Sequence, residues 1–249
     1  MRRDLPLLIG LWLAVAISAP ADARDLVVDL SAPVVKVTAG FAGTDLLLYG
    51  AKEAKGNIIV VIRGPAKDQV VRRKERIGGV WVNRSSQIFK AVPSFYWVAS
   101  NHHDLGSMLG AELRQIHQIG VEELEFSLDD NTAIDPDIWE FRDAIKRVNQ
   151  NAGLYSTGTQ DLIFLSDSLF KTRVRFPANV AVGAYGVDVY LVRNGEIVAS
   201  ETTILNVRKF GLEAAIFDFA HRQSLAYGII AIIIALFSGW LANAVFRKA

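Results

Sequence analysis

The sequence predicts a mainly β protein: an immunoglobulin-like β-sandwich, either one composite or two, with a helical insertion and one C-terminal transmembrane helix. Three observations support this fold class. Short runs of alternating or β-rich residues recur at intervals of roughly 8–12 residues, as in antiparallel sandwiches. A stretch with helical spacing interrupts them near the middle of the chain. A long apolar segment without any charged residue lies near the C-terminus.

The composition narrows the class of protein. The chain has 249 residues, of which 51% are hydrophobic and 21% charged, and it has no cysteine. It is too apolar for a disordered chain and too charged for a multi-span transporter. Without cysteine there is no disulfide framework, thiol nucleophile, thiolate zinc site or cysteine-bound iron–sulfur cluster. The net charge of +1 gives no reason to expect a nucleic-acid partner.

The N-terminus has the three parts of a secretory signal peptide. The basic pair Arg2-Arg3 precedes an apolar stretch, Leu5–Ile17, and the small residues Ala21 and Ala23 follow it. We therefore expect a signal peptide over residues 1–23, with cleavage after Ala23. The alternative is an uncleaved anchor, although the apolar stretch is short for a bilayer, which needs about 20 residues.

The first β region is expected over residues 24–100. Its turns are marked by glycine, asparagine and proline, which supply or fix the backbone angles of tight turns. Eight strands are predicted, at Leu26–Leu30, Val34–Thr38, Asp45–Tyr49, Asn57–Arg63, Val70–Ile77, Val80–Asn83, Ile88–Val92 and Phe95–Ala99.

Residues 101–153 are expected to form the helical insertion. Apolar residues from Leu105 to Ile119 recur at helical spacing, and a short strand is predicted at Leu124–Leu128. Asp135-Pro136 resembles an N-cap followed by proline at the first helical position. A second helix, with Ile138 and Phe141 on its apolar face, is expected to end near residues 151–153.

Residues 154–209 return to β patterning. Strands are predicted at Leu162–Leu165, Thr172–Phe176, Tyr185–Arg193 and Glu196–Val207. Asn194-Gly195 between the last two is a strong signal for a two-residue hairpin turn. The sequence leaves open whether the two β regions form one composite sheet system or two separate domains.

The C-terminus predicts attachment to a lipid bilayer. A juxtamembrane helix is expected over residues 210–223, and the uncharged run 224–246 is long enough to cross a bilayer. The tail 247–249 is basic, which places it in the cytoplasm and the body on the export side. In a Gram-negative bacterium this corresponds to the periplasm and the inner membrane. Small residues share one face of the span at intervals of four, a spacing that permits close helix packing but is also common by chance: Ala231, Ala235 and Gly239.

Charge is unevenly distributed along the exported body. Residues 63–90 carry eight basic and two acidic residues, whereas residues 104–140 carry ten acidic residues and one basic residue. One interpretation is that the insertion packs near the basic strands and the charges neutralise each other. The other is an anion or lipid-headgroup site formed by arginines, whose forked guanidinium matches oxyanions: Arg63, Arg72, Arg73 and Arg76.

Two segments contain residue types that bind metals. The His102-His103 pair, with His117, offers imidazoles for zinc or copper, although adjacent histidines diverge on a strand or a helix. An acidic segment, 129–140, follows part of a calcium-loop register but has Ile134 where that loop needs glycine. No nucleophile elbow or phosphate-binding glycine loop is present in the sequence. We therefore expect neither a cofactor nor an enzymatic activity.

Several short stretches, distributed over nearly the whole mature chain, resemble a known family. They are Ile62-Arg63-Gly64-Pro65, Arg73-Lys74-Glu75-Arg76, Gly79-Val80-Trp81-Val82-Asn83, Val92-Pro93-Ser94-Phe95-Tyr96, Leu169-Phe170, Pro177-Ala178-Asn179, Gly183-Ala184-Tyr185, Tyr227-Gly228 and Gly239-Trp240. On these stretches the chain is similar to the alphaproteobacterial putative transmembrane protein family of unknown function. The resemblance implies an association with sulfite-exporter-type permeases.

Three functional hypotheses follow from the sequence. The first is a membrane-anchored periplasmic accessory protein that assists a membrane permease, such as an anion exporter. The second is a periplasmic anion- or metal-binding domain that uses the arginines or histidines named above. The third is an enzyme of a type that leaves no recognisable motif.

Overall fold

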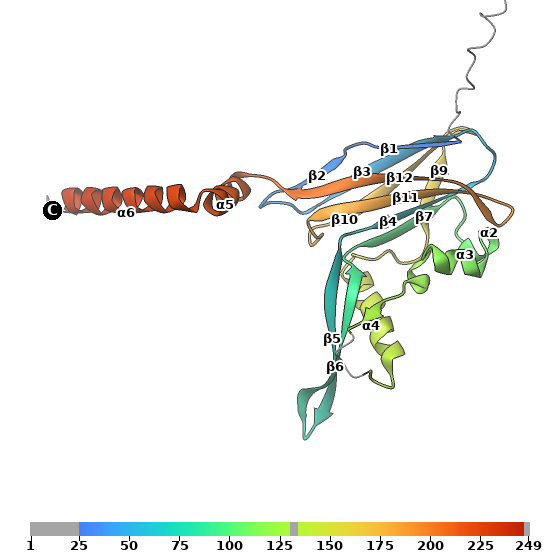
Figure 1. The fold of residues 1–249 in the computed structure, drawn as a ribbon, viewed down its shortest axis with the longest axis horizontal. Coiled ribbons are helices and arrows are strands. Elements are labelled where there is room, and N and C mark those ends of the chain that lie inside the picture. The colour runs from blue at the N-terminus through green and yellow to red at the C-terminus, as the bar shows by residue number, and fades with distance from the viewer. Residues whose placement is uncertain (1–24, 130–133, 247–249) are drawn as a thin grey trace, which may run out of the picture.

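The computed structural model describes residues 25–129 and 134–246 and shows a mainly β body followed by two helices (Figure 1). The predicted signal peptide, 1–23, and tail, 247–249, lie outside the described residues. The strands are β1 (Leu26–Leu30), β2 (Val34–Val37), β3 (Gly43–Lys52), β4 (Asn57–Arg63), β5 (Ala66–Ile77), β6 (Val80–Pro93), β7 (Tyr96–Ser100), β8 (Ser127–Leu128), β9 (Gln160–Phe164), β10 (Leu169–Pro177), β11 (Gly183–Arg193) and β12 (Glu196–Lys209).

Nine strands form one curled sheet in the order β1-β3-β10-β9-β7-β4-β11-β12-β2. Its pairs are antiparallel except β12 with β2 and β7 with β9, which are parallel. The curl brings β1 into contact with β12. Strands from before and after the helical insertion alternate in this sheet, so the two β regions are combined in one composite structure. The mainly β prediction is confirmed, and the immunoglobulin-like arrangement stays a prediction.

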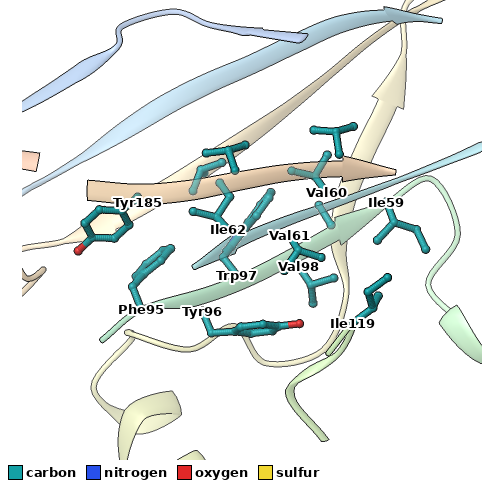
Figure 2. Close-up of a cluster of buried hydrophobic side chains, with 14 of the residues drawn as sticks. Ile59, Val60, Val61, Ile62, Phe95, Tyr96, Trp97, Val98, Ile119 and Tyr185 are labelled. Carbon is teal, nitrogen blue, oxygen red and sulfur yellow. The ribbon is translucent and has the colours of Figure 1, made fainter. Parts of the chain in front are cut away.

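The core is centred on β4 and β7. Five consecutive residues of β4, Ile58–Ile62, are fully buried, as expected for an apolar strand covered on both faces. Figure 2 shows four of these side chains, Ile59–Ile62, with Phe95 and Tyr185 toward one end and Ile119 of the insertion toward the other. The ring of Phe95 stacks on that of Phe176 with centroids 4.9 Å apart.

A second sheet, in the order β5-β6-β8, projects from the body as a long hairpin (Figure 1). It continues the β4–β7 ribbon: Gly64 N–H donates to the Phe95 carbonyl and Ser94 N–H donates to the Pro65 carbonyl. A Cβ at Gly64 would lie 2.7 Å from Ser94 Oγ and 2.9 Å from Phe95 Cβ, so this crossing requires glycine. The ribbon therefore leaves the nine-stranded sheet at this point and extends beyond it.

The predicted strands overlap the observed ones, and several were too short. Leu124–Leu128 was too long, because only Ser127–Leu128 pairs with β6. The predicted strands Val80–Asn83 and Ile88–Val92 are two ends of one strand, β6, because β5 pairs with it continuously through two bulges. The predicted hairpin turn is confirmed, since Asn194 and Gly195 both have positive φ, at 52° and 86°. The tip turn Gly78-Gly79 also has positive φ at both residues.

The insertion covers the outer side of β4 and β7 and one side of the hairpin. Its helices are α2 (Leu105–Met108), α3 (Ala111–Ile116), the 3-10 turn η1 (Val121–Glu123) and α4 (Ile138–Asn151). Helical spacing predicted one helix from Leu105 to Ile119. The structure divides it, because Leu109 adopts extended backbone and bridges to Gly195.

The second helix of the insertion begins two residues later than expected. Asp137 occupies the N-cap position, and Asp135 instead accepts a hydrogen bond from the Asp137 N–H in a turn before the helix. The prediction that Asp135 is the N-cap was wrong. Proline lies in the turn at 136, so it does not start the helix.

Two helices follow the body. α5 (Leu212–Arg222) ends at Gln223, whose backbone is not helical, and α6 (Ser224–Phe246) begins directly after it. Residues Ser224–Asn243 have a mean hydropathy of 2.2 and are not buried by the rest of the chain. Among the described residues this is the helix long and apolar enough to cross a membrane, as the sequence predicted.

Candidate interaction site

The β5–β6 hairpin divides its charged residues between two faces. Alternate residues of β5 point to opposite sides, and directly paired residues of β6 point to the same side as their partners. One face is turned toward α4 and holds Arg73 and Glu75, which are half-buried. The outward face holds Arg72, Lys74 and Arg76, which are exposed. Consecutive residues in a basic run therefore have different surroundings.

On the α4-facing side, Arg73 is neutralised by the insertion. Its guanidinium nitrogens lie 3.5 Å from Asp135, 3.1 Å from Asp137 and 3.2 Å from Glu140. The hydrogen bond to Asp137 raises the pKa of Arg73, and Glu140 adds to the effect. The guanidinium also lies over the ring of Phe141, 5.4 Å from its centroid. For Arg73 the neutralisation interpretation is confirmed.

On the outward side, the three basic residues have neutral neighbours. Arg72 pairs with Ser86, Lys74 with Asn83 and Arg76 with Trp81. Arg76 Nε donates to the Gly79 carbonyl at 3.3 Å. Within residues 25–129 and 134–246, no carboxylate forms an ion pair with any of the three. Arg72, Lys74, Arg76 and Trp81 are called the outward face below.

The tip of the hairpin exposes large apolar side chains. Trp81 is 66% exposed, Val80 64% and Ile77 55%, and they surround the Gly78-Gly79 turn. Behind the tip, Arg84 pairs with Glu75 at 2.9 Å on the α4-facing side. The hairpin thus presents an apolar end followed by a row of cations. Neither feature contributes to the core of the body.

A pocket of about 410 Å³ lies between the hairpin and α4. It combines an exposed indole, apolar residues and groups of both charges. Its lining residues are Val71, Arg72, Arg73, Trp139, Glu140, Phe141, Asp143, Ala144 and Arg147. This pocket is open and adjoins the outward face at Arg72, so both features belong to one surface region.

Arg63 lies in the body, apart from the hairpin arginines. Its guanidinium contacts Asp188 at 2.6 Å and donates to the carbonyls of His117 and Gln118. Tyr96 fixes the same turn, because its hydroxyl donates to the Gln118 carbonyl and accepts from the Gly120 N–H, each at 2.7 Å. Burial raises the pKa of Tyr96 to about 12. The four predicted arginines therefore do not form one site.

His103 and His117 contact different parts of the body. His103 Nε2 lies 3.4 Å from Asp161 Oδ1, with both side chains largely exposed. His117 is the C-cap of α3, and its ring is 5.4 Å from that of Tyr190. Residues 25–129 and 134–246 contain no group of three histidine or acidic side chains that could hold a metal ion. Of the calcium-register residues, Asn131 lies outside the described part of the chain, and Asp135, Asp137 and Glu140 contact Arg73.

The small-residue stripe on the membrane helix lies on exposed surface. Ala231, Ala235 and Gly239 are all exposed, and in the described structure α6 packs against α5. Their role in helix packing stays a prediction.

Sequence reasoning identified the basic run but not its division into two faces. The signal was present, because alternation along a strand separates Arg72, Lys74 and Arg76 from Arg73. The sequence did not predict the position of α4, and that position decides which face of β5 is neutralised.

The fold and this surface define a mainly β protein with one candidate membrane helix and a projecting hairpin that exposes basic side chains. The chain matches the family described as "Putative transmembrane protein (Alph_Pro_TM)" over residues 25–248, and it belongs to that family. No curated protein matches the chain.

Proposed function

We propose that this protein is a membrane-anchored accessory protein that binds a membrane partner and catalyses no reaction itself. The resemblance noted in the sequence implies that the partner is a permease that exports a small anion such as sulfite. In this proposal the signal peptide is removed, the β body lies in the periplasm, and α6 crosses the inner membrane with the tail in the cytoplasm. Lipid bilayer and permease are then its partners.

The observation that carries this proposal is the projecting β5–β6 hairpin. Its exposed tip and outward face are not needed to bury the core, yet they combine the aromatic and arginine side chains that are enriched at protein interfaces. A chain anchored beside its partner needs only a modest affinity, because the anchor raises the effective concentration. An interaction role therefore explains both the membrane anchor and the projecting β5–β6 hairpin.

The experiment is affinity purification of the tagged full-length chain from native membranes after mild crosslinking. We expect an integral membrane permease to be recovered with it. A matched control replaces α6 by an unrelated apolar span, which keeps the anchor and the body but removes the stripe Ala231, Ala235 and Gly239. Recovery of the protein alone contradicts the proposal.

Orientation is tested separately with reporter fusions. A reporter placed after Ala249 is expected to be active in the cytoplasm, and one inserted at the exposed hairpin turn Asn194-Gly195 is expected to be active in the periplasm. The reverse pattern contradicts the proposed topology.

A second candidate function, an anion-binding domain, is favoured by the row of cations on β5 that have no ion pair within the part of the chain that the structure describes. Arg72, Lys74 and Arg76 lie on one face at alternate positions, which suits oxyanions. Calorimetric titration of the detergent-solubilised full chain with sulfite, sulfate and phosphate tests it, and zinc and copper test the histidine alternative. Absence of heat and of any melting shift removes this candidate.

A further inference from the structure

We propose that the outward face of the β5–β6 hairpin is the docking surface for an acidic region of a second protein in the same membrane. The proposal rests on the accessory function above and names the surface that carries it. The outward face consists of Arg72, Lys74, Arg76 and Trp81, and the apolar tip adjoins it.

The first argument is charge balance. Three of the seven basic residues on β5 and β6 have a carboxylate supplied by the described chain: Arg73 contacts three, Arg84 contacts Glu75, and Lys90 contacts Asp68 at 2.8 Å and Asp129 at 3.8 Å. The outward face receives none from the described residues. Asp135, Asp137 and Glu140 of the insertion contact Arg73 on the opposite face, so within the described residues the charge of the outward face is left for a partner to complement.

The second argument is the aromatic residue within the cationic row. Trp81 pairs directly with Arg76 across the hairpin and is 66% exposed. An indole beside a guanidinium is costly to leave in water and is a typical energetic centre of a protein interface. The neighbouring Ile77 and Val80 supply apolar area around it. A surface that only kept an edge strand soluble would need the charges but not the indole.

The third argument is the direction in which the β5–β6 hairpin projects from the body. Figure 1 shows the hairpin projecting across the direction of α6, with its tip far from that helix. If α6 crosses the bilayer, an arm in this direction extends alongside the membrane rather than into it. Such an arm reaches a neighbouring protein that rises from the same membrane. This geometry favours an acidic protein surface over anionic lipid headgroups.

The experiment places a photocrosslinking amino acid at position 81 of the full-length chain in native membranes. The matched control carries the same amino acid at Val27, which is 51% exposed on β1. We expect an adduct from position 81, but not from 27, with an integral membrane protein, and the attached peptide, mapped by mass spectrometry, to be rich in Asp and Glu.

Charge reversal then tests the cations. R72E/K74E/R76E is expected to reduce the mapped adduct roughly tenfold or more, because each substitution places like charges across the interface. The control R173E/R175E/R208E makes the same change in net charge at exposed positions of β10 and β12, and should leave the adduct intact. Unchanged unfolding midpoints in both variants show that the body is folded.

The outcomes separate this inference from the proposed function. Adducts only with lipid or with a second copy of this chain, no adduct, or an adduct insensitive to the triple reversal each overturn the docking surface. If a permease still copurifies in those cases, the accessory function stands with another contact surface. If nothing copurifies, both proposals fail.

Discussion

β4 and β5 follow each other in the chain, separated only by Gly64 and Pro65, yet they are opposite in character. β4 lies between β7 and β11 and buries five apolar residues in succession, whereas β5 is the edge of a three-stranded sheet and alternates exposed with half-buried residues. Packing alone explains the composition of β4. It explains only the α4-facing half of β5, and the remaining half is the surface that we propose for docking.

The largest expected difference comes from one substitution made in both regions. Ile59→Ala removes a fully buried side chain from β4 and should lower the free energy of unfolding by about 2–5 kcal/mol. Ile77→Ala, at the hairpin tip and 55% exposed, should change it by less than about 0.5 kcal/mol. Denaturant unfolding of the full chain in detergent measures both.

Equal losses of unfolding free energy at positions 59 and 77 would contradict the distinction between the core of the body and the projecting β5–β6 hairpin. In particular, a large effect of Ile77→Ala would mean that the tip is packed against another part of the chain or a second copy.

Arginines provide the next comparison. Arg63→Ala removes the contact with Asp188 and two hydrogen bonds to insertion carbonyls, and should cost about 2 kcal/mol, because bonds to charged groups are among the stronger ones. Arg72→Ala removes an exposed side chain and should leave the unfolding midpoint unchanged. The same denaturant titration checks both, and a matching loss for Arg72→Ala would show that the outward face is structural.

Much of the fold was predictable because most local signals agreed with the final structure, although the helical spacing of 105–119 and the Asp135 N-cap did not. Alternation and turn residues located every major strand, and Asn194-Gly195 located a hairpin turn. The uncharged run 224–246 located the candidate membrane helix α6 to the residue. One feature of the fold was not predictable. Whether the two β regions share one sheet depends on long-range pairing such as β3 with β10, which leaves no local pattern.

The candidate site was predicted only as a charge imbalance. The neutralisation of Arg73 by the insertion followed from the opposite charges of the two segments. The projection of the hairpin did not, because it depends on the close approach at Gly64 and on the absence of a further strand beside β5. The grouping of Arg63 with Arg72, Arg73 and Arg76 failed because β4 and β5 belong to different sheets.

Alkaline pH should lower the stability of the body, where the buried tyrosines lie, and not that of the β5–β6 hairpin. Burial raises the pKa of Tyr96 to about 12, while an exposed tyrosine ionises near 10. The unfolded chain therefore releases this proton first, so the stabilisation is complete below pH 10 and is lost as the pH rises toward 12. For Tyr96 alone the loss between pH 8 and pH 11 is about 1.4 kcal/mol.

The measurement is the free energy of unfolding against pH in the wild type and in Tyr96→Phe. The variant should show a shallower decline, with the remainder due to other buried tyrosines such as Tyr185, whose pKa burial also raises to about 12. Identical slopes in the two proteins would contradict the assignment to Tyr96.

The smallest effect should distinguish the two faces of β5 itself. Arg73→Ala leaves Asp135, Asp137 and Glu140 without their common cation, so it should lower the unfolding midpoint slightly, and more at low salt than at high salt. Lys74→Ala, the next residue on the opposite face, should leave the midpoint unchanged at any salt concentration. Partner crosslinking should show the reverse order, because Lys74 belongs to the proposed docking surface and Arg73 faces α4. If Arg73→Ala reduced crosslinking as strongly as Lys74→Ala without loosening α4, the division of the hairpin into a structural and an interacting face would be wrong.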